Sequence, residues 1–242
     1  MTHAHGPTSE SFSAAAAPVP VSRLADAVVP EAEGADEWLL IVDQVCHGIH
    51  HALNNRIGSL SALLELTRLG DIPPNDPAFA SLSSELTRLE ECARTIRLLP
   101  RAAVGEEPLI IDDVLADVLA VHMFLHELRE TPLSLSPTRF VEPVRAERWA
   151  LVRALVLMLA DAKRLAKKTR AAVKTSVESD ERWVRVAFRV EPAPVGEVPT
   201  PLRSAYAESL AASISGTITR DEGRIELRLP TLKMRRAEQR SS

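Results

Sequence analysis

Aromatic residues make up only 4% of this 242-residue sequence, and cysteine occurs twice, at Cys46 and Cys92. With so few aromatic side chains, a core has to be built mainly from Leu, Val, Ala and Ile. The two cysteines lie in separate helix-like segments and form no metal-type pair. Two cysteines in a chain of this length favour a reducing, cytoplasmic location over a disulfide-stabilised secreted fold.

Long apolar runs and an excess of positive charge are also missing. No run of 18 apolar residues occurs, so we expect no membrane-spanning helix. The Ala-rich start lacks a basic segment and a long apolar segment, so no signal peptide is expected. The net charge of -4 gives no reason to expect a nucleic-acid partner. The remaining composition, 45% hydrophobic and 26% charged, is typical of a globular protein with one or two domains.

The longest helix-like pattern in the sequence contains three of its seven histidines. Its apolar residues recur every three or four positions and predict one buried helical face: Trp38, Val42, Val45, Ile49, Leu53, Ile57, Leu60 and Leu64. At about 100° per residue, His51 lies almost opposite this stripe, and Asn55 lies one turn further on the same side. A histidine that points outward from a rigid helix keeps its ring nitrogens available to a partner.

This pattern predicts a helical hairpin at residues 36–104. The first helix is expected from Glu37 to about Leu69, and a second from Pro77 to about Leu99, with a Gly- and Pro-containing turn between them. Two long helices with a short connection pack antiparallel. A lone hairpin leaves an apolar stripe uncovered, so we expect a homodimer in which two hairpins form a four-helix bundle.

Beyond residue 105 short strands and helices alternate, which predicts an α+β fold. Helices are expected over residues 112–130, 147–168 and 205–213, and strands over 108–111, 133–136, 171–177, 182–190, 214–220 and 224–229. The expected organisation is a flexible arm at 1–35, the hairpin at 36–104, an α/β domain at 105–230 and a basic polar tail at 231–242.

The segment His51-Ala52-Leu53-Asn54-Asn55-Arg56-Ile57 resembles the H-box of two-component histidine kinases, in which the histidine accepts a phosphoryl group. The order of elements after residue 105 resembles the ATP-binding domain of the same family, and residues 144–162 are similar to its N-box segment. The similarity spans about residues 37–230. It implies a dimerisation and phosphotransfer hairpin followed by a histidine-kinase-type α/β sandwich.

The departures from the family lie where the nucleotide would bind. The two N-box asparagines that hold Mg²⁺ and phosphate align with Leu157 and Asp161. In the Asp-x-Gly-x-Gly motif, Glu191 takes the acidic position, while Ala193 and Val195 replace the glycines. Because transfer from ATP depends on Mg²⁺ and on positioning of the phosphates, we expect a degenerate ATP-binding domain with no cofactor of its own.

The position after the phosphoacceptor carries Ala52, where family kinases have an acid that acts as general base. The chain thus resembles stand-alone dimeric histidine phosphotransferases, which relay phosphoryl groups between receiver domains. This resemblance implies that His51 is the phosphoacceptor and that Asn55 orients the reacting groups. The expected partners are response-regulator receiver domains, which supply Mg²⁺, with an upstream hybrid histidine kinase as a further candidate. Residues expected to contact a receiver are His47, Gly48 and Asn54.

Several alternatives stay open from the sequence. His50 is the acceptor if the register is shifted by one residue. Two further alternatives are a catalytically inactive scaffold that binds regulators and a weak ATP-dependent kinase that uses Glu191 and Asp161 as substitute ligands. His47, His50 and His51 have the spacing of a helical metal site, but no further ligand cluster completes it, so no metal is expected.

Three further side chains are interpreted from their position alone. Arg56 projects near the apolar face of its helix, where it either extends its charge to solvent or pairs with an acid across the bundle. His122 and His126 lie one turn apart on a predicted helix and are expected on the surface.

Overall fold

The computed structural model describes residues 35–69, 77–100, 105–136, 140–193, 205–221 and 223–241. The predicted arm lies outside these residues except for Ala35, as does Val195. The elements in order are α1 (Ala35–Arg68), α2 (Pro77–Leu98), β1 (Glu107–Leu109), α3 (Ile111–His122), α4 (His126–Arg129), β2 (Leu133–Leu135), β3 (Val144–Ala146), α5 (Arg148–Thr169), β4 (Ala172–Ser179), β5 (Trp183–Glu191), α6 (Ala205–Ser213), β6 (Thr217–Asp221), β7 (Arg224–Pro230) and α7 (Leu232–Ser241).

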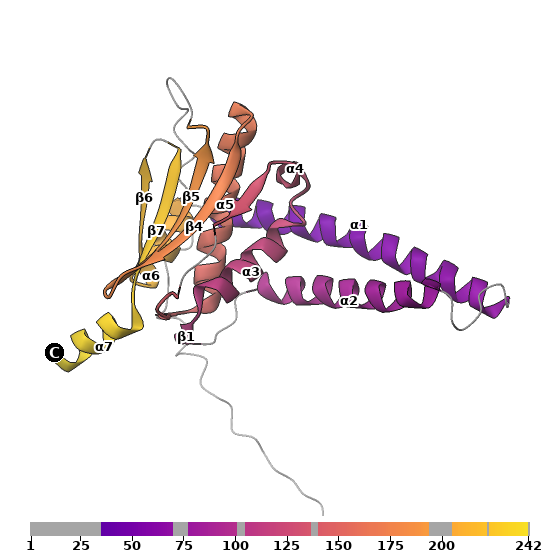
Figure 1. Cartoon of the computed structure of the whole chain (residues 1–242), viewed down its shortest axis with the longest axis horizontal. Coiled ribbons are helices and arrows are strands. Elements are labelled where there is room, and N and C mark those ends of the chain that lie inside the picture. Colours follow the sequence, from indigo (N-terminus) through magenta and orange to yellow (C-terminus); the bar gives the residue numbers. More distant parts are fainter. Residues whose placement is uncertain are drawn as a thin grey trace, which may run out of the picture. The chain divides into compact units, whose positions relative to one another are not determined.

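The two N-terminal helices form the predicted hairpin, with α1 and α2 side by side (Figure 1). The apolar stripe of α1 is buried only in its first half, where Trp38, Val45 and Ile49 are at most 4% exposed. In the second half Ile57 and Leu64 are 54% and 62% exposed. The stripe is thus continuous in the sequence, but the chain itself covers only the half that packs on the following elements.

The sheet has five strands in the order β2-β4-β5-β7-β6, and all neighbours are antiparallel except β2 and β4. Alternate residues of β5 are buried, including Val186 and Phe188, because successive side chains of a strand point to opposite faces. Strands β1 and β3 form a separate antiparallel pair. The predicted combination of helices and a sheet is confirmed.

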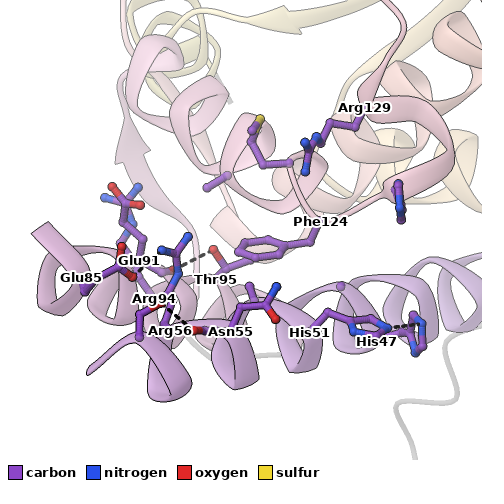
Figure 2. Close-up of a pocket in the computed structure, with 16 residues that line it drawn as sticks. His47, His51, Asn55, Arg56, Glu85, Glu91, Arg94, Thr95, Phe124 and Arg129 are labelled. Atoms are coloured by element: carbon purple, nitrogen blue, oxygen red, sulfur yellow. Dashed lines mark hydrogen bonds and ion pairs between the residues drawn. The ribbon is translucent and has the colours of Figure 1, made fainter. Parts of the chain in front are cut away.

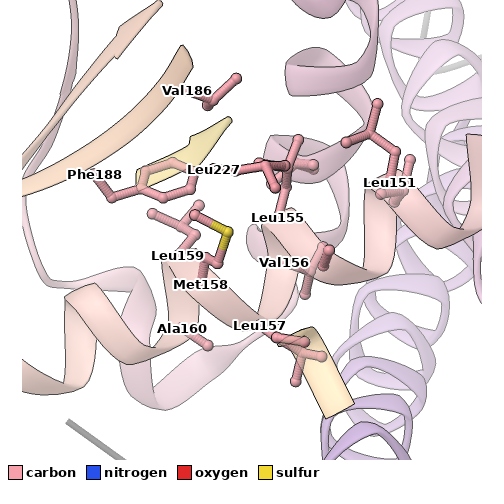
Figure 3. Packing of buried hydrophobic residues seen from close by; sticks show 14 of the residues in the cluster. Leu151, Leu155, Val156, Leu157, Met158, Leu159, Ala160, Val186, Phe188 and Leu227 are labelled. Atoms are coloured by element: carbon pink, nitrogen blue, oxygen red, sulfur yellow. The ribbon is translucent and has the colours of Figure 1, made fainter. Parts of the chain in front are cut away.

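Helix α5 forms the centre of the core. Sixteen of its residues, starting at Ala150, are buried on every side of the helix. Leu155 and Leu159 point towards Phe188 and Leu227 of the sheet, and Leu157 lies on the opposite side of the helix (Figure 3). A helix that is apolar all round is stable only when it is enclosed, and here the sheet and the other helices enclose it.

The hairpin and the sheet share this core. Trp38 of α1 lies under the guanidinium of Arg153 of α5, whose Cζ is 4.7 Å from the ring centroid. Arg153 Nη2 also donates a hydrogen bond of 2.8 Å to the carbonyl oxygen of Leu99. Buried side chains from both sides of residue 105 form one continuous cluster. The domain boundary that we expect near this residue stays a prediction.

Two expectations about local structure are wrong. The helix predicted over residues 112–130 is interrupted between His122 and His126, where the chain turns without a Gly or Pro. The predicted basic tail forms α7 instead, and the hydroxyl of Thr231 accepts a hydrogen bond of 3.1 Å from the backbone N–H of Met234. This is the geometry of a helix N-cap. Thr231 is a preferred N-cap residue, and it was the sequence signal for the start of this helix.

His122 is also misplaced by the sequence analysis, whereas His126 is exposed as predicted. The His122 side chain is only 3% exposed, and burial lowers its pKa to about 3, with the neighbouring charge of Lys163 as a second cause. His122 is therefore a neutral core residue. Within the described ranges, no helix is both long and apolar enough to cross a bilayer.

Candidate functional site

A cavity of about 830 Å³ lies between the hairpin and the turn that joins α3 to α4 (Figure 2). Its lining comes from α1, α2, α3, α4 and the α3–α4 turn, and 11 of its 16 residues are polar or charged. The lining residues are His47, Gly48, His51, Ala52, Asn55, Arg56, Ser59, Glu85, Glu91, Arg94, Thr95, Ala120, Met123, Phe124, His126 and Arg129. The outward face of α1 predicted from helical periodicity thus borders a defined hollow.

His51 has an exposed ring on this face, and His47 lies one turn before it. Their Nε2 atoms are 3.1 Å apart, and the rings meet edge to face with centroids 4.5 Å apart. One ring therefore donates and the other accepts. If His47 donates, His51 carries its own proton on Nδ1, and its Nε2 is the nitrogen with the lone pair that a nucleophile needs.

The other predicted site residues divide between two sides of α1. Asn55 lines the same cavity as His51 and His47. Asn54 lies outside that lining and instead has its Nδ2 3.2 Å from Nε2 of His50. The alternative acceptor His50 therefore pairs with an asparagine away from the residues that surround His51.

The surroundings of Gly48 show what its missing side chain permits. A Cβ atom at Gly48 would be 2.4 Å from the carbonyl oxygen of Phe124. In this conformation the chain's own α3–α4 turn occupies the space. The glycine does permit a close approach, and the backbone at Phe124 makes it.

Arg56 pairs with an acid across the hairpin, one of the two alternatives for this residue. Its Nη1 is 2.9 Å from Oε2 of Glu85 on α2, and Arg88 binds the other oxygen of the same carboxylate at 3.0 Å. The side chain of Glu85 is 16% exposed, so this ion pair is partly desolvated. It fixes α2 against α1 beside the cavity.

Among the cavity residues that the sequence analysis missed are Arg94, Phe124 and Arg129. Arg94 is on α2, and periodicity does not tell which polar side chains of one helix line a cavity together with those of another. Phe124 and Arg129 come from the region predicted as an uninterrupted helix, and only the turn after His122 brings them over α1. The sequence pattern over residues 112–130 predicted one continuous helix and gave no sign of this turn.

The two positions that the resemblance aligns with the N-box asparagines, Leu157 and Asp161, are enclosed by the protein itself. Leu157 is completely buried, and Asp161 is 4% exposed. Asp161 Oδ1 accepts a hydrogen bond of 3.2 Å from Arg164, and Oδ2 is 3.8 Å from Arg220. The network extends from Arg164 to Glu37 on α1 at 3.1 Å and from Arg220 to Glu208 on α6 at 2.7 Å. Asp161 therefore serves as the centre of an internal ion-pair network.

Glu191, which takes the acidic position of the Asp-x-Gly-x-Gly motif, is in a different setting. Glu191 is exposed at the end of β5, with its Oε1 4.0 Å from the ammonium group of Lys174. Ala193 is also exposed. Glu191 and Asp161 thus occupy opposite environments, one solvated and one enclosed.

Comparison with known proteins gives histidine kinases among the structural neighbours. No family model matches the chain, and no curated protein matches its sequence. The histidine kinase AdeS of Acinetobacter baumannii is similar with 19% identity and a TM-score of 0.37, over 75% of this chain and 96% of that one. The ATP-binding domain of PrrB from Mycobacterium tuberculosis is similar with 23% identity and a TM-score of 0.42, over 53% and 98%.

A third solved structure is the histidine kinase ThkA in complex with the response regulator TrrA. The similarity has 16% identity and a TM-score of 0.43, and it covers 86% of this chain and 69% of that one.

The three neighbouring histidines of α1 do not form a metal-ligand cluster. In the part of the chain that the structure describes, no group of three or more His, Cys, Asp or Glu side chains is arranged to hold a metal ion. The ring centroids of His50 and His51 are 6.2 Å apart, and their hydrogen-bond partners differ.

The enclosed Asp161 should make stability depend on pH. Burial, with the negative charge of Glu37 as a second cause, raises its pKa from 3.8 to about 7, while Arg164 and Arg220 oppose the change. Because the folded state holds this proton more tightly, its stabilising effect is complete below pH 3.8 and is lost as the pH rises through about 7.

We therefore expect Asp161→Asn to gain stability relative to the wild type as the pH rises from 5 to 8, on the order of 2–4 kcal/mol. Urea unfolding at a series of pH values measures this difference. Asp43→Asn, on the exposed face of α1, is the control and should show no such trend. A constant difference between Asp161→Asn and wild type across this range contradicts the prediction.

Proposed function

We propose that this chain is a histidine phosphotransfer protein that relays a phosphoryl group through His51 between response-regulator receiver domains. The observation that carries the proposal is the exposed imidazole of His51, on a long helix and beside a hollow that contains further cationic side chains. The burial of Leu157 and the ion pairing of Asp161 support a protein that does not draw its phosphoryl group from ATP.

The chemistry needs little from this chain beyond a positioned nucleophile. In the proposed step, Nε2 of neutral His51 attacks the phosphorus of an aspartyl phosphate in line. The new N–P bond forms as the O–P bond breaks, and the receiver's carboxylate leaves while Nδ1 of the imidazole keeps its proton. The receiver brings the aspartate and Mg²⁺, which offsets the charge on the phosphoryl oxygens. Asn55 orients the incoming group from one turn away.

A scaffold without catalytic activity is the second candidate. It is favoured by the contact between Gly48 and Phe124, which occupies the approach expected for a receiver, and by the engagement of His51 Nε2 with His47. The two candidates differ in whether a covalent phosphohistidine forms.

Incubation with a phosphorylated receiver should give acid-labile, base-stable label on the wild type and none above background on His51→Ala. The reason is that the proposal makes His51 the accepting residue, so its removal removes the acceptor nitrogen. His50→Ala is the control, because its ring pairs with Asn54 away from the cavity, and it should keep the label. Equal labelling of wild type and His51→Ala would falsify the proposal, and receiver binding without label would favour the scaffold.

Millimolar ATP with Mg²⁺ should leave the melting temperature unchanged, because a ligand that is not bound cannot stabilise the folded state. Differential scanning fluorimetry measures this, with an active histidine-kinase ATP-binding domain as the positive control. A shift that disappears in Asp161→Asn or Glu191→Gln would instead support the weak-kinase alternative.

We also propose that the protein is a homodimer. Its interface would be formed by the second half of α1 and the first half of α2. Exposed apolar side chains continue along both helices there, including Ile57, Leu64 and Leu86, and a second hairpin provides the apolar surface to cover them.

Leu64→Glu should convert the dimer to a monomer, because it places a charge in the apolar contact. Light scattering after size-exclusion chromatography measures the mass. Leu135→Glu is the matched control, since Leu135 is 53% exposed on the distant strand β2. A dimer that survives Leu64→Glu contradicts this interface.

A further inference from the structure

The cavity beside His51 contains two arginines that form no ion pair with any residue in the described part of the chain. Arg56, which also lines it, is held by Glu85 at 2.9 Å. Arg94 on α2 and Arg129 on α4 are exposed and make no hydrogen bond or ion pair with any described residue. The carboxylate of Glu91 also borders the hollow, so the lining carries three arginines, two acids and three histidines.

The two arginines come from different walls. In Figure 2, Arg94 lies on α2 and Arg129 on the far side of the hollow, with Phe124 between Arg129 and α1, which carries His51 and Asn55. Three separate elements thus contribute nitrogen-bearing side chains to the lining of one hollow. A guanidinium group presents several N–H donors in a plane, and its hydrogen bonds to phosphate oxygens are stronger than those between neutral groups.

We propose that this cavity is an oxyanion site in which Arg94 and Arg129 hold the phosphoryl group carried by His51. The proposal rests on the phosphotransfer function proposed above and adds two anion-binding residues, one of them from outside the hairpin. The ligand chemistry is a tetrahedral phosphate. A phosphoryl group on Nε2 carries about two negative charges, which these two guanidinium groups balance.

Two consequences follow from the positions of the arginines. A phosphoryl group that is bound on two sides is shielded from water, so phosphohistidine should persist longer than on an unsupported imidazole. Because Arg129 belongs to α4, the same contact would also hold the α3–α4 turn against α1 in the phosphorylated state.

The test compares Arg94→Gln and Arg129→Gln with Arg97→Gln. Arg97 is the matched control, since it is exposed on the same helix as Arg94 and does not line the cavity. Each protein is phosphorylated with phosphoramidate, whose P–N bond breaks as the imidazole N–P bond forms and ammonia leaves. The lifetime of the phosphohistidine is then followed by phosphorus NMR, and circular dichroism melts verify that all variants fold.

We expect the lifetime to fall roughly threefold to tenfold in Arg94→Gln and in Arg129→Gln, as for the loss of one charge-assisted hydrogen bond. Arg97→Gln should match the wild type. Equal lifetimes in all four proteins overturn the inference while leaving the proposed function intact. A failure to label His51 from either phosphoramidate or a phosphorylated receiver contradicts the proposed function and this inference together.

A second arm separates a covalent phosphoryl group from free phosphate. Inorganic phosphate is titrated into unlabelled wild type and His51→Ala, and the arginine side-chain N–H signals are recorded by NMR. The proposal predicts weak binding at most to both proteins. Tight binding of free phosphate to both, which is lost in Arg94→Gln, overturns the covalent assignment and identifies a free-phosphate site.

Discussion

The enclosure of α5 is the constraint on which the rest of the structure depends. A helix with apolar residues around its whole circumference has to be covered on every side. The sheet covers one side through Phe188 and Leu227, and α1, α3 and α6 cover others. Because the first turns of α1 take part in this core through Trp38 and Ile41, the helix that carries His51 is anchored to the sheet at its start.

The same packing encloses the two positions at which the sequence resemblance places asparagines. Where the histidine-kinase resemblance places an asparagine, Leu157 contributes to the core, and Asp161 joins α1, α5, α6 and β6 through Arg164 and Arg220. A carboxylate enclosed in this way is costly unless it is paired or protonated. Its surroundings therefore serve to join elements of the fold.

The charged side chains beside His51 are arranged differently from those around Asp161. The ion pair between Arg56 and Glu85 fixes α2 against α1, while Arg94 and Arg129 are exposed and have no ion-pair partner among the described residues. Exposed cationic side chains that line the same hollow as an imidazole are suited to an anion that arrives and leaves. The contact of Phe124 with Gly48 adds a constraint, since any large partner has to share this face with the α3–α4 turn.

Periodicity and turn chemistry predicted much of this molecule. They gave both hairpin helices, the helices α5 and α6, most of the strands and the outward direction of His51 and Asn55, because these depend on residues a few positions apart. They did not give the turn after His122, which lacks Gly and Pro, and they overlooked the capping signal of Thr231 for α7. They also assigned His122 to the surface, since burial of a polar residue depends on what packs over it.

The sequence by itself determined which side chains α1 presents on each face, because helical geometry is local. Only the tertiary structure decided which of them meet other elements: Glu85 with Arg56, Phe124 with Gly48, and Arg94 and Arg129 around His51. Contacts between residues far apart in the chain depend on how whole elements pack, and packing is settled by the shape and volume of the shared core.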